Sequence, residues 1–452
     1  MKKYLISLIG IFLFSSYLTA QLQLDAEFRI RPQLLHGYKK PVAKNTDPAF
    51  HIGQRTRLNL RYAKNHLKTL ISIQDVRVWG DENIVNPTGV KGKKDRTLDI
   101  YEAWVQFDVG KNSTLKIGRQ EMKYDDQRHI SWRNWWNRGQ TYDALTYSYK
   151  NKKTGWQFDV SASFNSKKED LTGNDYSDGT GYFGKVNPIL THDFVYLRKN
   201  FNPKSYVSLT IIGAGYQKEG TKNTIYLTMT EGVHVNYNMT KKATDGLFAK
   251  ANAFVQNGSN IQGKQVNAHM FTLLAGYRTM KKKLEFNIGF EYLSGNDAYN
   301  SSADYKKVDH TYNLLYGGRH PYYEGYMDWF VVPKSSLFGG LRTVSVGMMY
   351  KLSKSAKLKL AYNNVALANN VIKKDNHGQV VLKVDKGSNL AQTFDILYIN
   401  KFNKIVMLHA GFSYGIPSTD FNKMKGISNP GSNYFGFMML TVKPVLYKSV
   451  LK

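Results

Sequence analysis

The sequence predicts an all-β protein, a transmembrane antiparallel outer-membrane β-barrel of about 18 strands with short periplasmic turns and long extracellular loops. Three observations lead to this prediction. Apolar and polar residues alternate with a period of two from end to end of the 452-residue chain, as in strands that have one face on lipid and the other on a lumen. Long and short connections alternate between these strands. An apolar run at the N-terminus follows Lys2 and Lys3, in the pattern of an export signal.

The composition agrees with a barrel and excludes several other classes of protein. The chain has 63 Lys and Arg against 34 Asp and Glu, a formal net charge of +29, and no Cys. Without cysteine there are no disulfides, thiolate nucleophiles or Cys-ligated zinc or iron–sulfur sites. No stretch approaches the roughly 18 apolar residues of a membrane-spanning helix. We therefore expect residues 1–20 to be a signal peptide and residues 21–452 to form one barrel.

Each expected strand is justified by its own alternation. In the first strand, Leu24 and Phe28 lie on one face, and Glu27 and Arg29 lie on the other. The same pattern recurs along the chain, whereas helical periodicity does not. The eighteen expected strands cover residues 22–34, 50–63, 67–79, 98–109, 113–121, 141–150, 154–164, 190–200, 205–217, 224–238, 246–257, 266–279, 283–294, 338–351, 356–369, 391–402, 405–415 and 434–442.

The lengths of the connections predict the orientation of the barrel. Long connections follow the odd-numbered strands, and short ones such as Lys111-Asn112 follow the even-numbered strands. Short turns at one rim and long loops at the other are typical of an outer-membrane barrel with its N-terminus in the periplasm. A barrel of this width leaves an aqueous lumen, so we expect loops 122–140 and 295–337 to fold inward as constriction or plug elements.

Arginine is concentrated early in the sequence, with eleven of its fifteen residues before residue 139. In the second strand, Arg55, Arg57 and Arg61 share one face. An arginine on lipid near the bilayer midplane costs about 2–4 kcal/mol, so this row must face the lumen. Guanidinium groups bind carboxylates through two parallel hydrogen bonds, which favours an anion-selective pore. The candidate pore or substrate-binding arginines are Arg29, Arg31, Arg55, Arg57, Arg61, Arg77, Arg119, Arg128, Arg133 and Arg138.

Two interpretations of these arginines remain open. In one, they pair with inward acidic residues and brace the lumen wall, the acidic candidates being Asp25, Glu27, Asp75, Glu102 and Asp143. In the other, a surplus of arginine forms an electropositive path that contacts a passing anion.

Three tryptophans, Trp132, Trp135 and Trp136, lie in the 122–140 loop. They either anchor this loop against the wall or offer a stacking surface for sugar rings and a π partner for arginine.

Short motifs around the 122–140 loop and in the late loop region resemble those of a known family. They are Gly118-Arg119-Gln120, Gln127-Arg128, Tyr142-Asp143-Ala144, Ser294-Gly295-Asn296-Asp297 and His320-Pro321-Tyr322-Tyr323-Glu324-Gly325-Tyr326-Met327-Asp328. Together with the inward arginines, they resemble the alginate-export outer-membrane porins of Gram-negative bacteria. The resemblance implies an eighteen-stranded monomeric barrel with an arginine-lined constriction that passes an anionic uronate polymer. It also implies that Arg119, Arg128 and Asp143 belong to the constriction and its loop supports.

The C-terminus departs from the usual pattern of outer-membrane barrels. Many of them end on an aromatic residue, whereas this chain ends Ser449-Val450-Leu451-Lys452. We therefore expect Tyr434, Phe435 and Phe437 in the last strand to act as the assembly signal.

The sequence gives little support to an enzyme. Gly411-Phe412-Ser413-Tyr414-Gly415 matches the nucleophile elbow of serine hydrolases, but that motif needs a strand–turn–helix context and this segment lies in an alternating strand. The histidines are scattered without metal-ligand spacing. We expect no catalytic residues, no cofactor and no metal.

The expected function is passive diffusion of anionic solutes through an outer-membrane porin, with an acidic, uronate-like or alginate-like polysaccharide or its oligosaccharides as the preferred solute. A small-anion porin for phosphate or organic acids, or a general porin, shares the same arguments. A structural barrel, an adhesin and a barrel enzyme are further alternatives. The expected partners are the solute, outer-membrane lipid and lipopolysaccharide, the barrel assembly machinery and periplasmic export or uptake proteins, with no nucleic acid.

Overall fold

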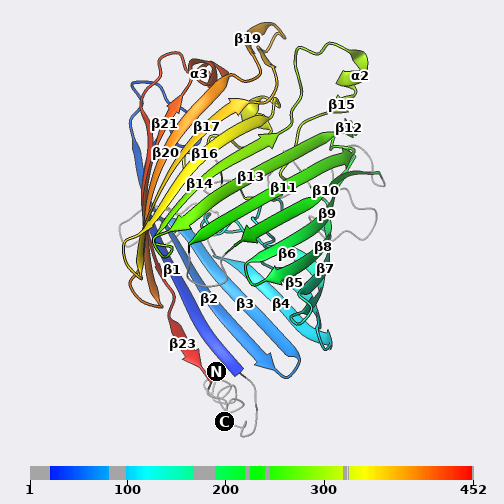
Figure 1. Ribbon diagram of the computed structural model, residues 1–452, viewed down its shortest axis with the longest axis vertical. Coiled ribbons are helices and arrows are strands. Elements are labelled where there is room, and N and C mark those ends of the chain that lie inside the picture. Colours follow the sequence, from blue (N-terminus) through cyan, green and yellow to red (C-terminus); the bar gives the residue numbers. More distant parts are fainter. Residues whose placement is uncertain are drawn as a thin grey trace, which may run out of the picture.

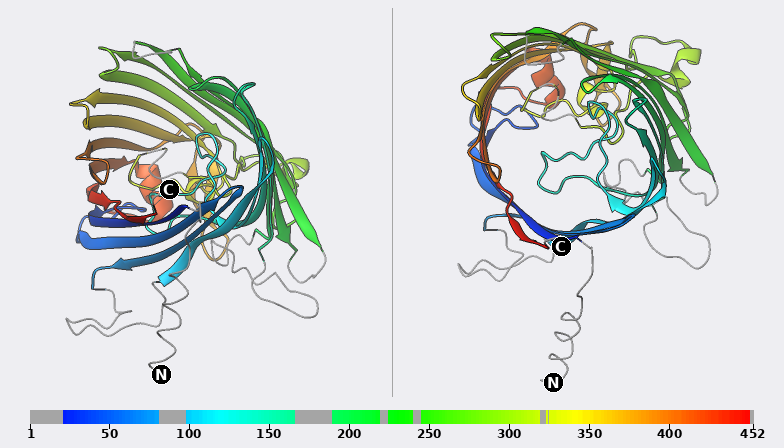
Figure 2. Two further views of the ribbon diagram at one scale, coloured as in Figure 1. Left: turned by 90° about the horizontal axis from the view of Figure 1, so that it is seen from below. Right: turned by 60° about the horizontal axis from the view of Figure 1, so that its bottom comes forward.

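The chain forms one closed antiparallel β-barrel (Figures 1 and 2). The computed structural model describes residues 21–80, 98–165, 189–218, 224–239, 245–318, 323 and 325–449. The expected signal peptide and most of the expected loops 80–97 and 165–189 lie outside these residues.

The wall strands are β1 (Gln21–His36), β2 (Ala49–Lys64), β3 (Leu67–Val78), β4 (Leu98–Gly110), β5 (Ser113–Gln120), β6 (Tyr142–Asn151), β7 (Trp156–Ser163), β8 (Thr191–Asn202), β9 (Ser205–Gln217), β10 (Ile225–Asn238), β11 (Gly246–Gly258), β13 (Ala268–Thr279), β14 (Leu284–Leu293), β16 (Leu341–Lys351), β17 (Ala356–Leu367), β20 (Asn389–Lys401), β21 (Val406–Pro417), β22 (Asn433–Val442) and β23 (Val445–Lys448).

The barrel closes because the first and last strands pair. β22 and β23 form one strand interrupted at Lys443 and Pro444, and both pair with β1. The 19 named strands therefore occupy 18 positions in the wall. All eighteen expected strands are confirmed, and, apart from the end of the last strand, their boundaries differ from the expected ones by at most three residues.

The last strand corrects one expectation. It continues through β23, where Tyr447 is exposed, instead of ending at residue 442. Phe435 and Phe437 are buried on the lumen side, so they do not present an aromatic surface to lipid.

Short elements in the connections were not expected from periodicity, because each spans too few residues to show one. β12 (Gln265–Val266) pairs with β15 (Val308–Asp309), and β18 (Val371–Lys374) pairs with β19 (Val380–Val384). In the described part of the chain, the helices are α2 (Ala303–Lys306), the 3₁₀ turn η3 (Lys334–Ser336) and α3 (Thr419–Lys425). None of the helices in the described ranges is long and apolar enough to cross a membrane.

The two faces of the wall differ as the alternation predicts. Outward side chains such as Ile117, Leu145 and Phe290 are apolar and exposed. Inward side chains such as Arg55 and Thr230 are polar and 0% exposed, because loops cover them.

Loops fill part of the lumen (Figure 2). Trp329, Phe330 and Phe421 of the long connections pack with Leu341 and Phe435 of the wall in one apolar cluster. A second cluster joins the connection between β5 and β6 to β8 and β9. These clusters hold the loops as packed structure inside the barrel, on the side of the long connections.

Candidate functional site

The connection between β5 and β6, residues 121–141 and here called the inner loop, reaches across the lumen to β1 and β2. Arg29 Nη1 of β1 donates to the carbonyl of Asn134 at 2.6 Å, and Arg31 Nη1 donates to the carbonyl of Trp135 at 2.7 Å. The tip of the inner loop is therefore bound by the wall arginines that the sequence singled out.

The arginines of β2 continue this pattern. Arg55 Nη1 donates to the carbonyls of Trp136 and Asn137, both at 3.3 Å. Arg57 Nη2 and Gln74 Nε2 donate to the carbonyl of Arg138, at 3.3 and 3.1 Å. Five consecutive carbonyls, those of residues 134–138, thus accept hydrogen bonds from the wall. Buried carbonyls need such donors, and the guanidinium fork supplies several from one side chain.

A single carboxylate balances much of the charge beneath the inner loop. Glu27 pairs with Arg55, with Arg29 at 3.4 Å and with Lys443 at 2.8 Å. Arg29, Arg55 and Glu27 are all buried. Because buried charges are costly unless they are paired, Glu27 is the group that makes this arrangement of arginines tolerable.

Arg57 has a different set of partners. Its guanidinium carbon lies 3.3 Å from the centre of the Tyr101 ring, and its Nε donates to Gln74 at 3.0 Å. Tyr101 in turn donates to Glu121 at 2.7 Å. Burial, with the nearby charge of Glu102, raises the pKa of Glu121.

The N-terminal half of the inner loop is anchored to β14, in a different part of the wall from β1 and β2. Arg128 forms ion pairs with Glu291 and with Asp126, the latter at 3.1 Å, and lies over the ring of Tyr323. Burial opposes the ionisation of Asp126, but the charge of Arg128, nearby histidines and a hydrogen bond from Asn252 together outweigh it, so the pKa of Asp126 is lowered. Burial raises the pKa of its neighbour Asp125.

Arg133 joins the inner loop to the connection between β14 and β16. Its Nε and Nη2 donate to the carbonyl of Gly317 at 3.0 and 2.6 Å. Loops 122–140 and 295–337 are thus linked inside the barrel.

The three tryptophans have different surroundings. Trp135 is buried, with Phe437 at 4.8 Å and the Arg31 guanidinium at 4.7 Å from its ring centre. Trp132 and Trp136 are half-buried, beneath Lys123 and Arg133 respectively. Trp135 anchors the loop, whereas a stacking role for Trp132 and Trp136 stays a prediction.

Two lumen arginines are exposed. The Arg61 guanidinium pairs with Asp25 at 2.8 Å. The Arg138 side chain is exposed at the tip of the inner loop, and its guanidinium has no hydrogen bond or ion pair with any residue the structure describes. Arg138 is therefore the inner-loop arginine that is free to meet a solute.

Three expected pore residues face the other way. Arg77 shares the outward face of β3 with Ile73, and Arg119 shares that of β5 with Ile117. Asp143 lies directly opposite Arg119 on β6, and the two form a bidentate pair at 2.8 Å. The expectation that these residues face the lumen is wrong, because strand alternation turns them outward.

Arg77 pairs with an acidic residue on the same outward face. Asp75 accepts from Arg77 Nε at 2.6 Å on the outer surface, so Asp75 and Asp143 do not brace the lumen. Gly118 explains the local geometry of β5, because its φ is +115° and a Cβ there would lie 2.3 Å from the carbonyl oxygen of Ala103. Other residue types rarely adopt such a backbone conformation.

A group of lysines that was not expected from the sequence also lies in the lumen. Lys250 of β11, Lys357 and Lys359 of β17 and Lys401 of β20 all lie on inward positions. Within the described ranges, their ammonium groups have no hydrogen bond or ion pair. Alternation would have revealed them, because Lys357 and Lys359 share a face with Asn363 and alternate with Leu358 and Leu360.

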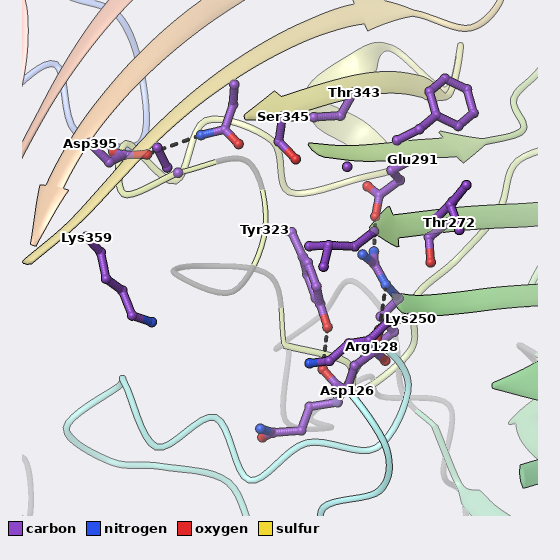
Figure 3. A pocket seen from close by; sticks show the side chains of 18 of the residues that line it. Asp126, Arg128, Lys250, Thr272, Glu291, Tyr323, Thr343, Ser345, Lys359 and Asp395 are labelled. Atoms are coloured by element: carbon purple, nitrogen blue, oxygen red, sulfur yellow. Dashed lines mark hydrogen bonds and ion pairs between the residues drawn. The ribbon is translucent and has the colours of Figure 1, made fainter. Parts of the chain in front are cut away.

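A cavity of about 470 Å³ lies between two of these lysines, Lys250 and Lys359, and the loops (Figure 3). Lys250, Ser345, Lys359 and Asp395 line it from the wall, and Arg128 and Tyr323 line it from the loops. Tyr323 also donates to the carbonyl of Asp126. The rest of the late motif quoted above lies partly outside the described residues, but Met327 is fully buried.

The enzyme-like motif of the sequence gains no support from the residues that the structure describes. Gly411, Ser413 and Gly415 all lie within β21, so the elbow-like motif has no strand–turn–helix context. Among the residues that the structure describes, no group of three or more His, Asp or Glu could hold a metal ion.

A closed antiparallel barrel with an apolar outer face, a polar lumen and inward-folded loops defines an outer-membrane porin. The model of the alginate-export family matches residues 20–413 of the chain, so the protein belongs to that family. Its class is that of porins and channels of the outer membrane, where it meets membrane lipid and passing solutes. No curated protein matches the sequence.

Solved porins of Pseudomonas share the fold at low sequence identity. OccK9 (OpdG) of Pseudomonas aeruginosa has a TM-score of 0.59 and 12% identity, over 94% of this chain and 98% of that chain. A BenF-like porin of Pseudomonas fluorescens Pf-5 has 0.57 and 11%, over 94% and 99%. Pseudomonas aeruginosa OpdK, solved with vanillate, has 0.56 and 9%, over 93% and 98%.

Proposed function

We propose that the protein passes anionic, carboxylate-bearing solutes passively across the outer membrane, with an acidic, uronate- or alginate-like polysaccharide or its oligosaccharides as the preferred class. The observation that carries the proposal is the set of lumen lysines, Lys250, Lys357, Lys359 and Lys401, which have no acidic partner at ion-pair distance among the described residues. Unpaired basic groups lining a pore attract anions and repel cations.

The arginines take two roles in this proposal. Arg29, Arg31, Arg55 and Arg57 position the inner loop, because each of them donates to at least one of its carbonyls. Arg61 and Arg138, whose side chains are exposed, contact the solute directly. Trp132 and Trp136 supply apolar surface for sugar rings on the same loop. No chemical step is part of this function.

The test is the reversal potential of single channels in a planar bilayer under a KCl gradient, followed by addition of alginate oligomers. We expect a potential that favours chloride and a current that alginate oligomers block more strongly than neutral oligosaccharides. A cation-selective channel would contradict the proposal.

A second candidate is a porin for small carboxylates. One observation favours it, since OpdK, which shares the fold, was solved with vanillate, an aromatic monocarboxylate. In the same bilayer experiment, block by vanillate or acetate without block by alginate oligomers would select this alternative.

A further inference from the structure

We propose that the cavity between β11 and β20 is a binding subsite for one carboxylated sugar unit, a single carboxylate on a hydroxyl-rich ring. This inference rests on the proposed function and gives it a place in the lumen. The cavity volume of about 470 Å³ falls in the range of roughly 300–1,000 Å³ that is common for small-molecule sites.

The positive side of the subsite consists of Lys250 and Lys359. Both side chains are exposed within the barrel, and they lie near enough to each other for their charges to interact. Neither forms a hydrogen bond or an ion pair with a described residue. Two such cations facing one cavity favour an anion between them.

The floor between the lysines is hollow because its residues are small. Gly289 and Ala361 line the cavity, and a Cβ on Gly289 would lie only 2.4 Å from Ser345 Oγ. A ring can therefore approach the wall closely at this point. The floor itself presents the hydroxyl of Ser345.

The opposite side offers hydrogen-bond acceptors for hydroxyl groups. Asp395 accepts from Asn363 Nδ2 at 3.1 Å and from the backbone N–H of Tyr326 at 3.2 Å, and no described cation pairs with it. The hydroxyl oxygen of Thr343 lines the same cavity, is buried and has no hydrogen-bond partner. These groups can accept hydrogen bonds from the hydroxyls of a sugar. The buried hydroxyl oxygen of Thr343, which has no hydrogen-bond partner among the described residues, would gain one from the bound sugar.

The combination of charges discriminates between anions. A monocarboxylate placed at the lysines directs its hydroxyls toward Asp395, which can accept from them. A phosphate, with up to two negative charges, gains from the lysines but is repelled by Asp395 and has no ring hydroxyls to donate. The chemistry of the subsite is therefore that of a sugar acid.

The roof is a positioning element. Arg128 is already held by Asp126 and Glu291, and the ring of Tyr323 covers its guanidinium. Arg128 therefore fixes the edge of the cavity instead of donating to a solute.

The test uses single channels of the full-length protein in a planar bilayer, with D-glucuronate, D-glucose and inorganic phosphate as probes. In the wild type we expect glucuronate to block the current more strongly than either of the others. The double variant Lys250→Gln/Lys359→Gln should weaken the block by about tenfold or more, and tenfold corresponds to about 1.4 kcal/mol. Ala361→Leu, which fills the floor without changing the charge, should weaken the glucuronate block while leaving the chloride preference unchanged.

The matched control is Lys357→Gln/Lys401→Gln, which removes the same charge from the same wall outside the cavity. Equal block in both double variants would overturn the subsite, as would phosphate block as strong as glucuronate block in the wild type. A wild-type channel without chloride preference would overturn the proposed function and the subsite together. Chloride preference with no glucuronate block would overturn the subsite alone. Heat-modifiable migration on gels verifies that each variant is folded.

Discussion

Arg29 on β1 and Arg55 on β2 lie directly opposite each other in the wall, and both guanidinium groups bind Asn134 of the inner loop. Two like charges at neighbouring positions of a sheet repel each other. They are held here because Glu27 pairs with both, and because each of them also donates to carbonyls of the inner loop. The lumen wall and the inner loop therefore form one polar network.

Replacing Glu27 by Gln is expected to lower the free energy of unfolding by about 3–5 kcal/mol, because two buried guanidinium groups would lose their counter-charge. Denaturant unfolding of the refolded barrel measures this change. Asp304→Asn is the matched control, since Asp304 pairs with Lys307 on the exposed surface and such pairs add little. Equal effects of the two substitutions would contradict the role given to Glu27.

Arg55→Lys is expected to keep the ion selectivity but to increase the current noise of open channels. Lysine keeps the charge but has one nitrogen, so it cannot bind Glu27, Asn134 and two loop carbonyls together. Arg61→Lys, at an exposed arginine with one carboxylate partner, should leave the noise unchanged. Quiet Arg55→Lys channels would argue against the arginine anchorage of the inner loop.

Docking of the inner loop should weaken as the pH falls below 6.5. Burial lowers the pKa of His129 to about 3, so the docked histidine is neutral. The Nε2 atom of His129 lies at hydrogen-bond distance, 2.7 Å, from the Tyr312 hydroxyl. A group whose folded pKa is depressed contributes stability that is present above the unfolded pKa and lost as the pH falls toward the folded value. At pH 5 the free energy that stabilises the docked inner loop is expected to be lower by about 2 kcal/mol.

Limited proteolysis within residues 121–141 at pH 7 and pH 5 measures this effect. His129→Gln should flatten the pH dependence, because the neutral amide does not titrate. His66→Gln, at an exposed histidine beside Asp108, should retain the dependence seen in the wild type. Unchanged cleavage of the wild type between the two pH values would refute the prediction.

Arg119→Gln is expected to leave the ion selectivity unchanged, because Arg119 and Asp143 lie on the outward face. Their side chains are 39% and 52% exposed, so the stability change should stay within about 0–1 kcal/mol. The reversal potential under a KCl gradient is the measurement. A shift toward cations in this variant would place Arg119 in the ion path after all.

Almost the whole fold could be predicted from the sequence, because the alternation of polar and apolar residues is visible directly in strands such as β2 and β14. The same rule also corrects the site. Arg119 follows Ile117 by two residues and so shares its outward face, a relation that the residue type alone conceals. Lys357 and Lys359 follow the same rule, because they alternate with Leu358 and Leu360 and so share the inward face of β17.

The remaining parts of the site depend on contacts that no local pattern encodes. Arg128 and Glu291 are 163 positions apart, and Arg31 meets a carbonyl 104 positions away. The bonds to residues 134–138 involve backbone carbonyls, which are the same for every side chain. Such contacts arise only when the barrel has brought loop and wall together.

Glu27 connects the closing seam of the barrel to the anchorage of the inner loop. Its carboxylate pairs with Lys443, at the interruption of the last strand, as well as with the arginines beneath the inner loop. Lys443 reaches Glu27 only when the end of the chain has paired with β1. The charge balance under the inner loop therefore depends on the closed wall, in which β1 pairs with β22 and β23. In a barrel still open between β1 and the last strand, Glu27 would lack Lys443, and the arginines that hold the inner loop would lack part of their charge balance.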